Sequence, residues 1–168
     1  RANPNLKIVT FYRDCHERNV SMFFQDLQYW ITTYTTAKSG YTRRENVDVL
    51  ADAFESTFNH FYADNWIEQE LARFTNIDTT DLYLEGLSFK ILKRENFELF
   101  IGRLEDLDQI VGPLSEFLNI PPIDLSKQAN RGAEKWYGPI YRKDRERLLA
   151  LSRMITFRFQ RLNRYEEK

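Results

Sequence analysis

The chain has few of the side chains that build thiol or imidazole sites. Its 168 residues include one cysteine, Cys15, and two histidines, His16 and His60. A single cysteine excludes an internal disulfide framework and a zinc cluster made of several thiolates. With so few imidazoles beside it, we expect no bound metal.

Glycine, proline and long apolar runs are also scarce. The 6 Gly and 5 Pro exclude collagen-like and linker-like sequences. No apolar run approaches the roughly 20 residues needed to cross a bilayer, so we expect no membrane span. The polar opening Arg1–Asn5 has no signal-peptide character, and with the single cysteine this predicts a cytoplasmic protein. The first residue is Arg1 and not Met, which predicts processing or a longer parent chain.

What the chain does contain is typical of a globular protein. Hydrophobic residues make up 42%, charged residues 29% and aromatic residues 15%. A chain of this length buries roughly 70% of its unfolded surface. We therefore expect one domain over residues 1–168 with a core rich in aromatic rings.

Hydrophobic patterning predicts an α/β protein with a small sheet. Short β-branched and aromatic runs indicate strands, and apolar residues at spacings of three and four indicate helices. The expected strands are 6–12, 83–93 and 97–102, and the expected helices are 20–31, 47–61, 64–74, 106–118 and 139 onward, with a loop at 32–42. We expect a mainly parallel sheet covered by helices, and N-terminal truncation would explain why so few strands are present.

Charge is unevenly distributed along the chain. Residues 45–81 carry a net charge of −8, and residues 139–165 carry +6. Two solvated helix faces that attract each other would explain this pattern. The basic helix is alternatively a surface for anions or acidic glycans. Nucleic acid is an unlikely partner because the whole chain has a net charge of −1.

The most informative segment runs from Arg13 to Ser21. Arg13 ends a predicted strand, and Ser21 follows eight residues later, near the start of the next helix. A strand–turn–helix offers free backbone N–H groups to an anion, and an Arg fork grips a phosphate with two parallel hydrogen bonds. Ser21 can donate a third bond, and Arg18 can add a second positive charge. The alternative is that Arg13 pairs with Asp14 or Glu17 and that Ser21 faces solvent.

Arg13 through Ser21 resembles the 3′-phosphate-binding motif of sulfotransferases that use 3′-phosphoadenosine 5′-phosphosulfate (PAPS). The rest of the chain is similar, in order, to one bacterial branch, the putative capsular polysaccharide synthesis family. Its name-giving Asn-Lys-Trp-Tyr-Ser signature resembles residues 134–138. Further similar segments are Arg18–Ser21, His60 with Trp66–Leu71, Asn76–Asp78 and Gly102–Leu107.

The resemblance implies a P-loop-like sulfotransferase fold and transfer of a sulfuryl group from PAPS to a sugar hydroxyl of a polysaccharide or other glycan. It implies that Arg13, Arg18, Ser21 and Lys135 bind the nucleotide donor, with PAP as the product. His60 is a candidate general base, beside Glu68 and Glu70. A histidine between two phenylalanines is, however, more typical of a core or surface position.

The sequence departs from the family at several points. Glu134 and Gly138 replace the outer residues of the signature, and no Gly-rich loop for the 5′-phosphosulfate occurs. The chain is therefore either the C-terminal part of a sulfotransferase or a non-catalytic α/β module that binds an anionic ligand or a protein partner. Whether it is an enzyme, which glycan accepts the sulfuryl group and which oligomer forms are left open.

Overall fold

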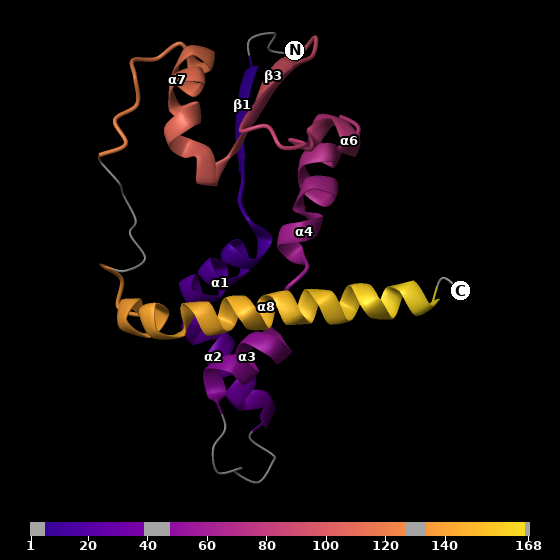
Figure 1. Cartoon of the computed structure of the whole chain (residues 1–168), viewed down its shortest axis with the longest axis vertical. Coiled ribbons are helices and arrows are strands. Elements are labelled where there is room, and N and C mark those ends of the chain that lie inside the picture. Colours follow the sequence, from indigo (N-terminus) through magenta and orange to yellow (C-terminus); the bar gives the residue numbers. More distant parts are fainter. Residues whose placement is uncertain (1–5, 39–47, 127–133, 167–168) are drawn as a thin grey trace. The chain divides into compact units, whose positions relative to one another are not determined.

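The chain folds into two compact units, traced along the sequence in Figure 1. The computed structural model describes residues 6–38, 48–126 and 134–166. The sheet unit comprises residues 1–13 and 66–129, and the helical unit comprises residues 14–65 and 130–168. Each unit is therefore discontinuous in sequence. The expectation of one domain over residues 1–168 stays a prediction.

A mixed three-stranded sheet forms the centre of the sheet unit. Its strands are β1 (Leu6–Tyr12), β2 (Phe89–Lys93) and β3 (Phe97–Arg103), in the order β1-β3-β2. β1 runs parallel to β3, and β2 runs antiparallel to it. The expected small sheet is present and is mixed: the parallel β1–β3 pairing is the longer one, and the short turn at 94–96 folds β2 back on β3 in the antiparallel direction.

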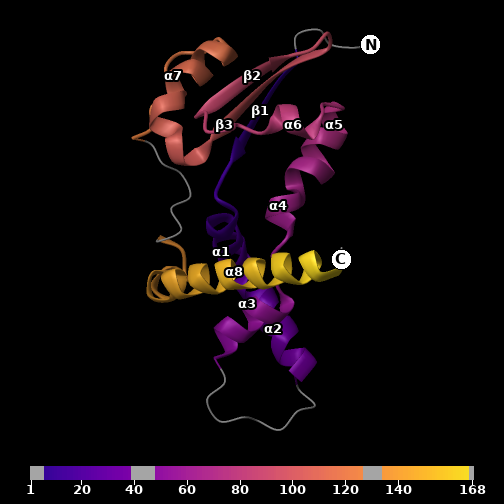
Figure 2. The same ribbon diagram turned by 45° about the vertical axis from the view of Figure 1, so that its right-hand side comes forward.

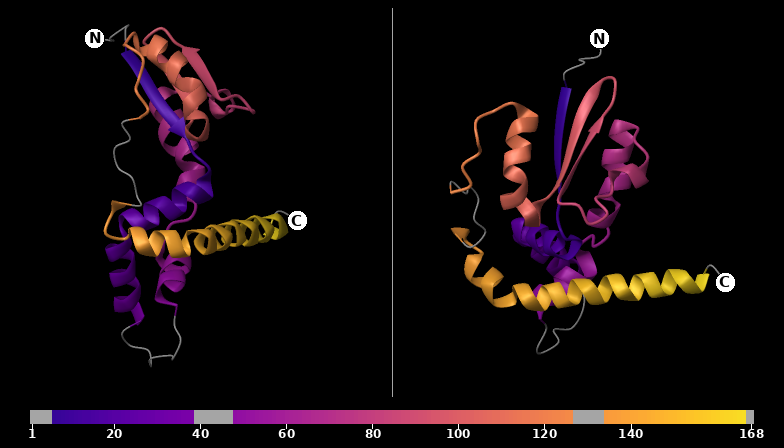
Figure 3. Two further views of the ribbon diagram at one scale, coloured as in Figure 1. Left: turned by 60° about the vertical axis from the view of Figure 1, so that its left-hand side comes forward. Right: turned by 45° about the horizontal axis from the view of Figure 1, so that its top comes forward.

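Side chains of β3 alternate between the two faces of this sheet. Helices cover both faces (Figure 3). One face packs on α7 (Leu107–Leu118), where the Phe100 and Phe117 rings lie 5.5 Å apart. The other face carries Leu99 and Ile101 into a second core. The helical segments of this second side are the π-helix η1 (Ile67–Ala72), α5 (Arg73–Thr75) and α6 (Thr79–Leu82).

Several sequence predictions for this unit are confirmed. The strand at 6–12 has the predicted bounds, and the hairpin turn lies at 94–96. The helix predicted over 106–118 is α7, preceded by a 3₁₀ turn, η2 (Leu104–Asp106). The predicted strand 83–93 is shorter, because residues 83–88 lack strand structure. The sequence also predicts a loop around Asn130–Gly132, and these residues lie outside the described part of the chain.

Four longer helices and an aromatic core make up the helical unit (Figure 2). They are α1 (Cys15–Gln25), α2 (Leu27–Lys38), α3 (Val49–Thr57) and α8 (Gly138–Glu166), and α4 (Tyr62–Trp66) continues into η1. α8 packs against α1 and α3, and α2 packs against α3. Phe23 lies at the centre, with the rings of Phe24, Phe54 and Phe58 all within 6 Å.

The helix predicted over 20–31 is in fact two helices. α1 begins five residues earlier because the Asp14 carboxylate accepts the backbone N–H of Glu17 at 2.9 Å and caps the helix. α1 ends at Gln25, and the turn residue Asp26 separates it from α2.

The prediction of a loop over 32–42 was wrong for residues 32–38, which form the second part of α2. Tyr34 is buried there, and its hydroxyl donates to Asp52 of α3 at 3.0 Å. Thr35 donates its hydroxyl to the carbonyl of Ile31 one turn back, at 2.9 Å. Residues 39–47 lie outside the described part of the chain.

Ion pairs link the basic α8 to its acidic neighbours within the helical unit. Arg145 pairs with Glu17 of α1, Arg147 pairs with Asp48 at the N-cap of α3, and Arg158 lies 3.5 Å from Glu55 of α3. These contacts support the interpretation that the uneven charges attract each other. The helix predicted from Pro139 onward is confirmed as α8.

Candidate functional site

The strand–turn–helix predicted around Arg13 is present. β1 ends at Tyr12, which lies opposite Arg103 of β3, and α1 begins at Cys15. The Tyr12 hydroxyl donates to the carbonyl of Leu82 at 2.7 Å, and burial raises the pKa of Tyr12 to about 12. This bond ties the carboxyl end of β1 to α6. Arg13 follows directly, as the last residue of this segment of the sheet unit.

The other two predicted donor-binding residues of this motif lie on α1 in the helical unit. Arg18 and Ser21 are three residues apart, so they share one face of the helix with about 5–6 Å between their Cβ atoms. The Arg18 guanidinium lies 5.8 Å from the centre of the Tyr62 ring. Ser21 is partly buried. The Asp14 cap occupies one backbone N–H at the helix N-terminus, so an anion there would face a carboxylate.

His60 is placed in the aromatic core of the helical unit and is only 4% exposed. Its Nε2 lies 2.7 Å from the carbonyl of Phe54, and its ring packs edge-on against the Phe54 and Phe58 rings. Burial lowers the pKa of His60 because it disfavours the imidazolium. These contacts favour the structural interpretation of His60 and leave its role as a base a prediction.

Sequence reasoning missed a buried polar cluster around His60. The buried Asn19 of α1 donates its side-chain amide to the carbonyl of His60 at 2.8 Å. His16 Nδ1 lies 3.0 Å from the hydroxyl of Ser152, which is fully buried on α8. Because a substrate cannot reach a fully buried hydroxyl, this pair joins α1 to α8 and is not a nucleophile with its base. The spacing of these residues in the sequence gives no hint of the cluster.

Lys135 lies in the short segment before α8, in the helical unit. Its side chain is exposed, and its carbonyl accepts the N–H of Gly138 at 2.8 Å. The neighbouring Tyr137 packs in the core against Phe24, with 5.8 Å between the ring centres. Trp136, in contrast, is 69% exposed. The aromatic pair therefore has one anchoring ring and one ring that faces solvent.

The exposed Trp136 and one polar face of α2 line a groove of about 880 Å³ in the helical unit. The lining residues on α2 recur at helical spacing, namely Gln28, Tyr29, Thr32, Thr33, Thr36 and Ala37, and Gln25 and Asp26 lie just before this helix. The sequence pattern does not reveal this groove, because it predicts a loop over 32–42, which includes the second half of this face. The signal that could have found it is Tyr29, an aromatic residue on the hydroxyl-rich side of the helix.

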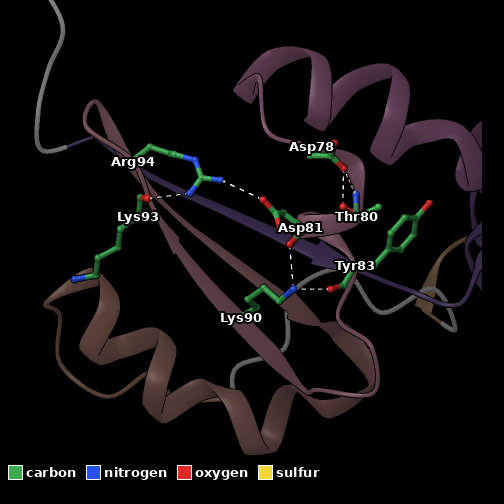
Figure 4. A network of polar contacts seen from close by, with 7 residues as sticks. All are labelled: Asp78, Thr80, Asp81, Tyr83, Lys90, Lys93 and Arg94. Atoms are coloured by element: carbon green, nitrogen blue, oxygen red, sulfur yellow. Dashed lines mark hydrogen bonds and ion pairs between the residues drawn. The ribbon is translucent and has the colours of Figure 1, made fainter.

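A separate polar network lies in the sheet unit and is shown in Figure 4. Lys90 donates to the carbonyls of Asp81 and Tyr83 at 3.0 and 2.9 Å, which satisfies the last carbonyls of α6. Arg94 lies 3.4 Å from the carboxylate of Asp81. The Asp78 carboxylate accepts from Thr80 and caps α6. These contacts join α6 to the β2–β3 hairpin, so we interpret the network as structural.

Within residues 6–38, 48–126 and 134–166, no group of three or more metal-binding side chains is placed to hold an ion. Among the helices of that described part, none combines the length and the apolar character that a membrane span needs.

The segments that resemble the capsular polysaccharide family lie in both units. Trp66–Leu71 falls at the start of η1, and Gly102–Leu107 covers the exit of β3 into α7. Glu134–Gly138 leads into α8 and contributes both the exposed Trp136 and the buried Tyr137. No family model, curated protein or solved structure matches the chain.

Proposed function

We propose that the chain is a sulfotransferase-like domain of P-loop-like fold that binds PAPS and transfers its sulfuryl group to a sugar hydroxyl of a glycan in the cytoplasm. The observation that carries the proposal is the strand–turn–helix of residues 6–25. Arg13 directly follows the strand, and Ser21 lies on the helix eight residues later. That order of elements and residues is what the 3′-phosphate motif requires.

In this proposal Arg13, Arg18 and Ser21 bind the 3′-phosphate of the donor. A guanidinium donates two parallel hydrogen bonds to phosphate oxygens, and a hydroxyl donates one more. Because these bonds involve charged groups, each contributes about 1.5–3 kcal/mol. Lys135, exposed before α8, would contact the nucleotide through its ammonium group.

The acceptor chemistry needs a base and in-line positioning. Sulfuryl transfer resembles phosphoryl transfer, in which the protein aligns donor and acceptor and neutralises charge on the transferred oxygens. Buried His60, with its lowered pKa, is neutral and could accept a proton only if an acceptor reached the core. The exposed Glu68 and Glu70 of η1 are more accessible candidates.

The test is a calorimetric titration with PAP and, beside it, AMP, which lacks the 3′-phosphate. PAP should bind more tightly than AMP, and Arg13→Ala should remove at least about tenfold of that preference. The matched control is Arg94→Ala in the same unit. Arg94 lies at the turn before β3, about 20 Å from the carboxyl end of β1. Equal binding of PAP and AMP, or an equal loss in both variants, would overturn the donor-site proposal.

Activity is tested separately from binding. With labelled PAPS and a polysaccharide acceptor, a working enzyme transfers the label to sugar. PAP binding with no transfer would favour the non-catalytic module of the same fold.

A further inference from the structure

We infer that the groove between α2 and the segment before α8 is a binding site for neutral carbohydrate. It lies wholly within the helical unit and has a volume of about 880 Å³, the size of an ordinary small-ligand site. The inference does not rest on the donor-site proposal, because it uses none of the residues proposed to bind PAPS.

Two aromatic rings with large exposed surfaces line the groove. Tyr29 is 61% exposed and Trp136 is 69% exposed. Single exposed rings are common, but exposed aromatic surface gathered beside a groove with polar residues around it is typical of a ligand-binding site. The C–H face of a pyranose is apolar, so it packs well on the electron-rich face of such a ring.

Each of the two rings contacts the more buried ring of the residue that follows it in the sequence. Tyr29 makes an edge-to-face contact with Trp30 at 4.7 Å, and Trp136 makes one with Tyr137 at 5.6 Å. Tyr137 is itself buried in the aromatic core. An edge-to-face contact covers at most one face of a ring, and both rings remain more than half exposed. A ring already held in position loses little entropy on binding.

The polar lining selects a neutral ligand that is rich in hydroxyl groups. Thr32 and Thr33 offer hydroxyls that both donate and accept, and Gln28 offers an amide that does the same. Asp26 is the only charged side chain among the described lining residues. No lysine or arginine is among the described lining residues, so this part of the lining offers no cation to a phosphate, sulfate or uronate.

α2 is a rigid base for this lining. On its opposite face, Tyr34 is buried and donates to Asp52 of α3 at 3.0 Å. The side chains of the groove are therefore presented by a helix fastened to the core, which fixes their spacing before a ligand arrives.

The test is native affinity electrophoresis of the full chain in gels that contain dextran, mannan, galactan or xylan. We expect migration to be slowed in at least one of these neutral gels. Tyr29→Ala and Trp136→Ala should each weaken the retardation about tenfold, since each removes one ring. Thr33→Val, which keeps the side-chain shape and removes the hydroxyl, should weaken it less.

The matched control is Phe157→Ala, which removes a ring that is 64% exposed on α8, in the same unit but outside the groove. This variant should be retarded like the parent. Thermal melts show whether the variants are folded, and all these side chains are exposed enough for the fold to tolerate their loss. No retardation in any of the four gels, or retardation that survives in both ring variants, would overturn the inference. A failure of PAP binding would leave it standing.

Discussion

Replacing Gly102 by alanine should destabilise the sheet unit through one identifiable clash. Gly102 lies in β3, and a Cβ atom there would sit 2.6 Å from Cδ1 of Ile110 on α7. It would also lie 3.1 Å from a ring carbon of Phe100 and 3.2 Å from one of Phe11. Ile110 is fully buried, so its side chain has little room to move aside. Overpacking of this kind costs about 1–3 kcal/mol.

A double-mutant cycle identifies the clashing atom. Ile110→Val deletes Cδ1, the atom nearest the new methyl group, and by itself costs about 0.5–1.5 kcal/mol. Combined with Gly102→Ala, it should cost less than the sum of the two single changes, because the cavity and the methyl group compensate. Urea unfolding followed by circular dichroism measures all four free energies of unfolding.

Gly112→Ala provides the control in the same unit. Its Cβ would meet nothing within 4 Å on the exposed side of α7. Alanine gains up to about 1 kcal/mol of helix propensity, part of which the following Pro113 opposes. We expect no loss of stability. If Gly102→Ala were as stable as the parent, or if the two changes at 102 and 110 were additive, α7 would not pack on β3 as described.

Three further predictions concern protonation and ion pairs. Because burial lowers the pKa of His60 below 6.5, the unfolded chain binds a proton more readily than the folded chain does. The free energy of unfolding should therefore fall as the pH drops below about 6.5. Urea unfolding at pH 7.5 and 5.5 measures this fall, which should be shallower in His60→Gln. Tyr12→Phe removes the hydrogen bond to Leu82 and should cost about 0.5–1.5 kcal/mol at neutral pH in urea unfolding. Since the pKa of Tyr12 is raised to about 12, the parent should lose this advantage as the pH rises above about 10. Arg145→Ala leaves the partly buried Glu17 carboxylate without its guanidinium partner. It should lower the melting temperature more than Arg158→Ala, because the ion pair of Arg158 with Glu55 is exposed. Equal shifts in melting temperature would contradict the described burial of Glu17.

The sequence was sufficient to predict the elements whose pattern reflects local structure. β1 and the two strands of the β2–β3 hairpin are short runs rich in aromatic, β-branched and leucine side chains, and a polar turn separates β2 from β3. α7 has a strong apolar stripe and ends at Asn119, which adopts the left-handed conformation typical of a helix end.

Tertiary contacts explain what the sequence did not reveal. Thr32–Lys38 has the composition of a loop, yet it is helical because Tyr34 reaches Asp52 and the core. The stripe from Val20 to Ile31 is continuous, so it gave no sign of the break at Asp26. The antiparallel direction of β2 follows from the short turn at 94–96, which has no room for the crossover that a parallel pair needs.

The candidate sites likewise include one that local sequence predicts and one that only tertiary contacts reveal. Arg13, Arg18 and Ser21 could be named from spacing and resemblance, since they lie within nine residues of each other. The carbohydrate groove joins α2 to Trp136, which is about a hundred residues away in sequence. His60 drew attention as a titratable group, but only its packing against Phe54 and Phe58 places it in the core.

The most direct test of the donor-site proposal is a nitrogen-15 NMR titration of the full chain with PAP and with AMP. We expect PAP to shift the backbone amides of Arg13 to Ser21 at concentrations where AMP leaves them unchanged. Equal shifts with the two nucleotides, or shifts confined to other parts of the chain, would contradict a 3′-phosphate site at the β1–α1 turn.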